Sequence, residues 1–239
     1  MSATHGTNLF TDDCVVCLDP SNKGYRKTPF HIQDHSGNGN DGYIAGGAMT
    51  TTYWTNVISF AADSNAGLVF DLDSPQIWTI SLLLKLPVIS RGGTISRIAG
   101  TNGVIDRGEI GIYTGTNEVW VNPPFGGWMP LEVGSAGITL NLDETAYICV
   151  TFKRNTDVSN IIGFKNGVKV VETTSSGADE GGISGYTLGS RSDFNGEYLP
   201  IEVYHATVHE RALTEQEVAQ NFEALRRRVT ISSGIPHGT

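Results

Sequence analysis

The segment from residue 119 to residue 131 gathers the side chains best suited to contacting a flat or apolar ligand. It contains Trp120, Phe125, Trp128 and Met129 in a run rich in proline and glycine. Pro and Gly at this density cannot form a central strand, so Phe125, Trp128 and Met129 are expected on a loop. Loop aromatics anchor interfaces or stack on sugars. The alternative is that the loop folds over an open end of the fold and buries them.

Cys14 and Cys17 have the spacing of a redox or zinc half-motif. A zinc site would need two further ligands at matching spacing, and none appears. In an extended strand, residues three apart point to opposite faces. We therefore expect both cysteines, and Cys149, to be small buried residues with free thiols rather than metal ligands or a disulfide.

Neither the acidic residues nor the histidines form a catalytic pattern. Glycosidases of all-β folds need two or three carboxylates close together, and here only Asp71 and Asp73 have same-face spacing, with a turn at Ser74 directly after them. His205 and His209 face the same way on a strand but lie roughly 13 Å apart along it, too far to share a metal. No Gly-x-Ser-x-Gly elbow is present. The chain is therefore predicted not to be an enzyme. The other close acidic pairs are Asp12-Asp13, Asp143-Glu144 and Asp179-Glu180.

Short alternating segments separated by turns predict an all-β fold that must position these side chains. The 29 glycines fit numerous turns. In the segment 146–154, Ala146, Ile148, Val150 and Phe152 share one face and Tyr147, Cys149, Thr151 and Lys153 the other. Asn166-Gly167 supplies the two positive-φ positions of a type I′ hairpin turn. The expected strands cover 14–18, 56–60, 67–71, 77–86, 94–99, 109–114, 117–122, 146–154, 160–165, 168–173, 185–190 and a strand-like stretch from 196 to 209.

One helix is predicted near the C-terminal end. Thr214 and Glu217 form a capping box, and Leu213 with Val218 a hydrophobic staple. The apolar residues Val218, Phe222 and Leu225 share one face, which must dock on another element because so short a helix is unstable alone. The arginines at 226–228 are expected at the end of the helix, where cations complement its dipole.

Charge and hydropathy exclude several classes of partner. The formal net charge is −9, which argues against nucleic acid, because phosphate binding needs clustered Lys and Arg. No stretch approaches the roughly 20 apolar residues that span a bilayer. Residues 1–12 contain no basic region followed by an apolar run, so no secretory signal peptide is expected. We expect a chain that is made and at first kept in a cytosol.

Five sequence elements, in this order, resemble the laminin-G-like, concanavalin-A-like jelly-roll family. Together they cover about residues 14 to 226. The segment from Gly100 to Leu140 has no clear counterpart in that pattern, and His209 stands where an aromatic residue is usual. The elements are 18–22 (LDPSN), 34–42 (DHSGNGNDG), the hairpin 164–170, the pair 188–190 and 194–196, and 211–217 (RALTEQE).

The resemblance implies a two-sheet antiparallel β-sandwich with the C-terminal helix packed outside one sheet. The expected organisation is an N-terminal arm over 1–13, one sandwich domain over 14–228 and a C-terminal arm over 229–239. The wider family often holds calcium at the sandwich rim through Asp and Asn oxygens. Residues 34–41 could supply them, although such residues more often form Asx-turns. Calcium is thus the one cofactor considered.

The function expected from this resemblance is that of a virion component. The spacing of 18–22 to 36–42 is similar to modules of phage virions, and a binding module without an export signal suggests release by lysis. The leading hypothesis is a non-enzymatic, homo-oligomeric capsid decoration or tail-associated protein. Its partners would be other virion proteins, such as the major capsid protein, and surface glycans. The alternatives are a carbohydrate-binding lectin that uses calcium, and a glycosidase or polysaccharide lyase.

Overall fold

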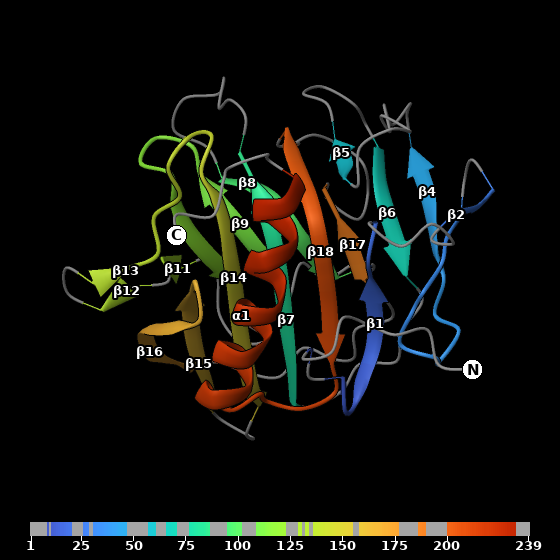
Figure 1. The fold of residues 1–239 in the computed structure, drawn as a ribbon. Helices are drawn as coiled ribbons and strands as arrows, with labels where there is room; N and C mark the ends of the chain where they lie inside the picture. The colour runs from blue at the N-terminus through green and yellow to red at the C-terminus, as the bar shows by residue number, and fades with distance from the viewer. Residues whose placement is uncertain are drawn as a thin grey trace, which may run out of the picture.

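In its described residues, the computed structural model consists of two large antiparallel sheets, one two-stranded hairpin and one helix. We call the large sheets A and B. Sheet B lies behind sheet A in Figure 1, and the helix crosses the front of sheet A. The structure describes residues 9, 11–20, 26–28, 31–46, 57–60, 66–70, 77–86, 95–101, 109–122, 129–130, 132–133, 136–154, 158–176, 186–189 and 200–232.

Sheet A has seven strands in the order β1-β18-β7-β14-β15-β16, with β5 also paired to β18. Its three central strands are long, and each pairs antiparallel with its neighbours. The bounds are β1 (Cys14–Leu18), β5 (Ile58–Phe60), β7 (Ile77–Lys85), β14 (Thr145–Arg154), β15 (Val158–Lys165), β16 (Val168–Ser176) and β18 (Ile201–His209).

Sheet B has nine strands in the order β11-β10-β9-β8-β17-β6-β4-β3-β2. A separate two-stranded hairpin pairs β12 (Glu132–Val133) with β13 (Ala136–Gly137). The bounds in sheet B are β2 (Arg26–Thr28), β3 (His31–Ile32), β4 (Gly42–Gly46), β6 (Ala66–Phe70), β8 (Ile95–Thr101), β9 (Glu109–Tyr113), β10 (Glu118–Asn122), β11 (Met129–Pro130) and β17 (Tyr186–Leu188).

The main core lies between the two sheets. The face of β14 that carries Ile148 and Val150 points into it, as the alternation predicts, and both side chains have no exposed surface. Ile110 and Ile112 of β9 contribute from sheet B. The predicted all-β sandwich is therefore confirmed. Burial of this apolar surface is the main force that holds the sheets together.

The opposite face of sheet A forms a second, smaller core beneath helix α1 (Glu215–Ser232). Tyr147 and Cys149 of β14 are fully buried there, beneath Val218 and Leu225 of the helix. The rings of Tyr147 and Phe222 stack with centroids 6.1 Å apart. Figure 1 shows the helix crossing the strands at this position. The prediction that the helix packs outside a sheet is confirmed.

The hairpin turn between β15 and β16 supports the helix directly. Asn166 and Gly167 both have positive φ, 51° and 79°, as the predicted type I′ turn requires. The Asn166 side chain accepts a hydrogen bond from the backbone N–H of Tyr147 at 2.9 Å. A Cβ placed on Gly167 would lie 3.1 Å from Phe222, so the glycine also allows the helix to approach.

The helix begins with the predicted capping box. The Thr214 N–H donates to Glu217 Oε2 at 2.8 Å, and the Glu217 N–H donates to Thr214 Oγ1 at 3.3 Å. Arg211 adds a clamp that the sequence did not reveal. Its guanidinium donates to both carboxylate oxygens of Glu217, at 2.9 and 2.8 Å, and to Asp13 at 3.1 Å. The start of the helix is thereby tied to the residue that precedes β1.

The helix is longer than predicted. It continues to Ser232, so residues 229–232, expected as the start of a C-terminal arm, are helical. Adding a residue to an existing helix needs far less free energy than starting one, so weak local signals suffice. The arginines at 226–228 consequently do not occupy the last turn, and Arg226 instead donates to Glu223 at 2.6 Å. Among the described residues, no helix is long and apolar enough to cross a membrane.

Six short strands were not predicted: β2, β3, β4, β11, β12 and β13. The first three fall in a stretch read as polar residues and turns, and β4 begins and ends with glycine. They exist because a neighbouring strand supplies the pairing, as β6 does for β4. Such tertiary pairing overrides weak local preference.

We expect the Arg211 clamp to make stability depend on pH. The hydrogen bond from Arg211 lowers the pKa of Glu217 to about 2 from 4.5, against the opposing effect of burial. The carboxylate therefore stabilises the fold above about pH 4.5, and this contribution is lost as the pH falls toward about 2. Glu217→Gln should lower the free energy of unfolding by about 1 kcal/mol at neutral pH.

Urea unfolding from pH 7 down to pH 2 would measure this difference. Glu223→Gln removes an exposed carboxylate from the same helix and serves as the control. A Glu217→Gln deficit that stays constant from neutral to acid pH would contradict the clamp.

Candidate functional site

The candidate site is an aromatic pair on the outer face of sheet B, the face turned away from the core. Val119 and Val121 of β10 point into the core. Because side chains alternate along a strand, Trp120 and Glu118 lie on the opposite face. On β9 the same alternation places Tyr113 on this outer face.

A tight turn joins the two strands and brings the aromatic rings together. The N–H of Asn117 donates to the Tyr113 carbonyl at 2.8 Å, and Asn117 has a positive φ of 60°. A Cβ on Gly115 would lie 2.9 Å from the Tyr113 ring, so the missing side chain leaves room for that ring. The Tyr113 and Trp120 rings are tilted by 36°, with centroids 5.6 Å apart.

The register of sheet B extends this face beyond the two rings. Trp120 lies opposite Gly111 on β9, and Gly111 lies opposite Arg97 on β8. Gly111, at the centre of this row, is buried and leaves the backbone beside the indole without a side chain. Glu118 lies opposite Tyr113. We call Tyr113, Glu118 and Trp120, with Gly111 beside them, the aromatic platform.

Among the described residues, only some of the polar atoms of the platform have hydrogen-bond partners. The Glu118 carboxylate accepts a hydrogen bond from Thr116 Oγ1 at 2.7 Å in an exposed position. The Trp120 side chain is half-buried, and its Nε1 is buried with no hydrogen-bond partner among the described residues. A buried donor of this kind can be completed by water, by a ligand or by another part of the chain.

The structure describes two of the four predicted site residues, and both lie in strands. Trp120 lies in β10, as the strand predicted over 117–122 requires. Met129 was expected on a loop but lies in the edge strand β11, opposite Val121. Proline and glycine are tolerated in an edge strand, which explains the difference. Phe125 and Trp128 lie outside the described residues.

Sequence reasoning missed Tyr113 and Glu118 as members of the site. The signal was present, because two alternating strands flank Gly115-Thr116-Asn117, a typical hairpin turn. Reading that turn would have placed Tyr113 opposite Glu118 and next to Trp120. Only the register of the pairing gives this arrangement with certainty.

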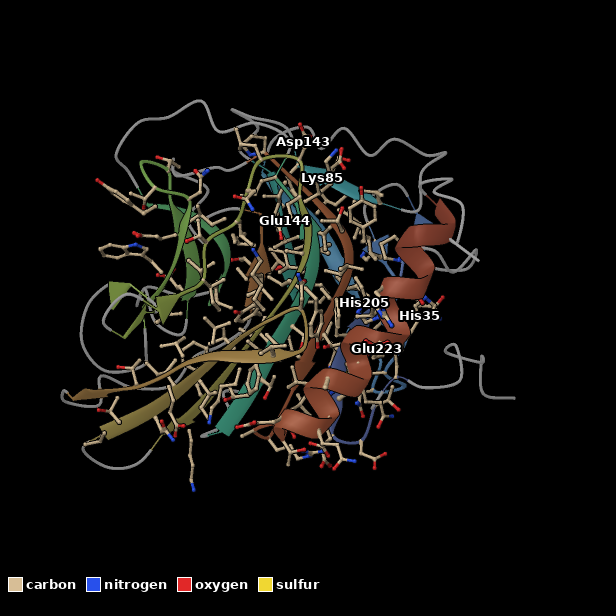
Figure 2. All side chains as sticks on the ribbon, turned by 60° about the vertical axis from the view of Figure 1, so that its left-hand side comes forward. His35, Lys85, Asp143, Glu144, His205 and Glu223 are labelled. Carbon is tan, nitrogen blue, oxygen red and sulfur yellow. The ribbon has the colours of Figure 1, made fainter. Side chains whose placement is uncertain are left out.

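A second cluster of reactive side chains lies where β1 pairs with β18. The Cys17 thiol is 3.9 Å from Nε2 of His205, which comes from a strand 188 residues later. His35 lies at the start of the loop that bonds to β1, and its N–H donates to the Cys17 carbonyl at 2.9 Å. Figure 2 shows His35 and His205 on the side of the molecule that helix α1 covers. In the described part of the chain, no three His, Cys, Asp or Glu side chains converge as metal ligands.

The cysteines are buried and free, as predicted. The prediction that Cys14 and Cys17 face opposite ways is wrong, because the pairing of β1 with β18 is irregular between Cys14 and Val16. A bulge of this kind shifts the alternation by one residue. The thiols consequently interact, and the hydrogen bond with Cys14, together with burial, raises the pKa of Cys17 well above its usual value. Burial raises the pKa of Cys149 to about 12.

The carboxylates at 143 and 144 are paired with lysines. Lys85 lies 3.1 Å from Asp143, and Lys165 lies 3.0 Å from Glu144. Burial opposes ionisation of Glu144, but hydrogen bonds from Asn141 and the charge of Lys165 lower its pKa. Figure 2 shows Lys85, Asp143 and Glu144 gathered at one end of the sandwich. Asp71, Asp73, Asp179 and Glu180 lie outside the described residues.

Asp34 fastens the glycine-rich loop to β1. Its Oδ1 accepts the N–H groups of Cys17 and Ser36 at 2.9 and 2.8 Å. Its Oδ2 accepts Ser36 Oγ at 2.6 Å and the Asn40 N–H at 3.1 Å. The Asp34 N–H in turn donates to Asp41 Oδ1 at 2.9 Å. Both oxygens of Asp34 are engaged in this turn, and calcium binding at residues 34–41 stays a prediction.

Comparison with known proteins identifies the fold of the chain. No protein-family model matches the chain, and no curated protein matches it in sequence. Solved structures do match: Trypanosoma rangeli sialidase in complex with sialic acid superposes with a TM-score of 0.65 and 13% identity, over 91% of this chain and 34% of the sialidase. The fold is a jelly-roll-like β-sandwich.

Toxin binding domains share this fold. The binding domain of botulinum neurotoxin DC, in complex with SialylT, superposes with a TM-score of 0.62 and 11% identity over 90% of this chain and 52% of that domain. The binding domain of Paraclostridial Mosquitocidal Protein 1 gives 0.60 and 16% identity, over 90% and 53%. The chain therefore spans between a third and about half of these proteins. Binding domains are among the proteins built on this sandwich.

The prediction that the chain is not an enzyme is contradicted by these neighbours, because several of them are sialidases. It rested on the missing array of carboxylates along one strand, and such an array is only one way to build a hydrolase. At 13% identity over 34% of the sialidase, the likeness shows the shared fold alone.

We expect the three cysteines to be unreactive in the folded protein. All are buried, and the pKa values of Cys17 and Cys149 are raised, so little thiolate is available to attack a reagent. Titration with a chromogenic aromatic disulfide at pH 8 should detect no thiol in the native protein. The same titration in urea should detect all three. Rapid reaction of a thiol without denaturant would contradict the described packing.

Proposed function

We propose that the chain is a carbohydrate-binding module whose site is the aromatic platform. The observation that carries the proposal is the Tyr113 and Trp120 ring pair, 5.6 Å apart and turned away from the core. Aromatic rings present a large rigid surface that loses little conformational freedom on binding. Pyranose rings have apolar faces that such a surface can stack against.

The position of the platform supports the same function. Helix α1 covers the outer face of sheet A, whereas the green strands that include β9 and β10 lie on the other side of the molecule in Figure 2. The half-buried Trp120 and Tyr113 combine apolar surface with polar groups at the edge. Glu118 beside them can accept hydrogen bonds from hydroxyl groups.

The structural neighbours support binding as the type of function. Their ligands in the solved complexes are SialylT for the botulinum neurotoxin DC binding domain, rat synaptotagmin II for the same domain, and sialic acid for Trypanosoma rangeli sialidase. These ligands include sugars and a protein. The aromatic platform favours a sugar for the present chain, and Phe125 and Trp128 of the adjoining segment are proposed to extend its surface. Met129 is not part of this extension, because it lies opposite the core residue Val121.

Replacing the indole should weaken binding. Trp120→Ala removes the larger ring of the pair, so affinity for a bound glycan should fall at least about tenfold. Binding of the purified protein to a glycan array measures the effect. Val168→Ala, at a 65% exposed position on the edge of sheet A, is the matched surface control. Urea unfolding of each variant confirms that the fold is intact.

The same array separates the competing functions. Full binding by Trp120→Ala would place the site elsewhere, and no binding by the wild type would overturn the proposal. Loss of binding with a chelator would support the proposed calcium site at residues 34–41. Release of reducing sugar from a bound glycan would identify hydrolysis in place of simple binding.

The virion role expected from the sequence is proposed as the setting of this binding. It is supported by the resemblance of residues 18–22 and 36–42 to modules of phage virions. The chain would then be a capsid decoration or tail-associated protein, in several copies, in contact with the major capsid protein. Mass spectrometry of purified virions should find the chain at high copy number. Its absence from virions would refute this setting without affecting sugar binding.

A further inference from the structure

We infer that the aromatic platform selects uncharged sugars and disfavours sugars that end in sialic acid. This inference rests on the proposed function. The structural neighbours would suggest the opposite preference, because T. rangeli sialidase was solved with sialic acid. The reason is the charge placed beside the rings in this chain.

Glu118 sits inside the platform rather than at its border. It lies opposite Tyr113 in the register and two residues from Trp120, so it shares the outer face with both rings. Side chains directly opposite each other in an antiparallel pair have Cβ atoms about 5 Å apart. A sugar stacked on the rings therefore places its substituents within a few ångströms of the Glu118 carboxylate.

The carboxylate is also held in this position. Thr116 Oγ1 donates to Glu118 Oε2 at 2.7 Å from the turn that joins the two strands. A neutral sugar can donate a hydroxyl hydrogen to the remaining acceptor positions of Glu118. The carboxylate of sialic acid has no hydrogen to donate, and its negative charge repels the Glu118 carboxylate.

The size of the effect follows from the exposure of the platform. Two like charges about 4 Å apart in water repel by about 1 kcal/mol, which is roughly a fivefold change in affinity. The net charge of −9 on the whole chain adds to this repulsion at low ionic strength. Salt screens both contributions, because the Debye length is about 10 Å at 0.1 M.

Arg97 is the cationic residue that could oppose this selection. It lies opposite Gly111 on β8, whereas Trp120 lies opposite the same glycine on β10. Neighbouring strands are about 4.8 Å apart, so the backbone of Arg97 is about 10 Å from that of Trp120. The Glu118 backbone is nearer to the rings, because it lies on β10 itself and opposite Tyr113. We therefore expect the acidic residue to dominate.

The test is an array of matched glycans, each printed once with a neutral end and once capped by sialic acid. Wild-type protein should bind the neutral member of a pair roughly fivefold more tightly at about 0.01 M salt, and this ratio should fall as salt rises. Glu118→Gln should bring the ratio close to one. Glu172→Gln removes an exposed carboxylate from sheet A, with the same change in net charge, and should leave the ratio as in the wild type.

The outcomes separate this inference from the proposed function. Stronger binding of the sialylated member, lost in Trp120→Ala, would overturn the inference and leave the carbohydrate platform in place. Equal ratios for wild type and Glu118→Gln would overturn it as well. If no member of any pair binds, the platform does not bind sugars and both proposals fail.

Discussion

Sheet A is apolar on both faces, and the rest of the molecule follows from the need to cover them. On β14 the alternate residues Ile148 and Val150 meet sheet B, while Tyr147 and Cys149 between them meet the helix. A strand of this kind cannot stand at a surface, because one of its faces would expose large side chains to water. The sandwich and the helix are therefore one solution to a single constraint, in which each layer buries one side of the same strands.

The helix is attached by several independent contacts. Arg211 ties the cap residue Glu217 to Asp13 before β1, and Thr79 Oγ1 joins the same loop by donating to the Arg211 carbonyl at 2.8 Å and accepting the Leu213 N–H at 3.0 Å. These contacts connect the two ends of the described chain to the middle of sheet A. The helix closes the outer face of sheet A in this way, and the proposed binding site lies on the outer face of sheet B, at the half-buried Tyr113 and Trp120.

The proposed site depends on strand pairing more than on any single motif. Tyr113 and Trp120 are separated by a short turn, and the register sets their rings beside each other and beside Glu118. The same register places Gly111 next to the indole. A platform of this type needs no unusual residue, which is why residue counts and spacing patterns revealed only part of it.

The sequence alone determined the features that depend on neighbouring residues. The capping box at Thr214, the turn at Asn166 and the two faces of β14 were predictable, because each arises from backbone geometry within a few positions. Only the tertiary structure decided which distant segments meet. The approach of Cys17 to His205, the bulge in β1 and the pairing of the short strands β2 to β4 and β11 depend on partners remote in sequence. Local preference carries no information about such partners, because the free energy of pairing appears only when both strands are in place.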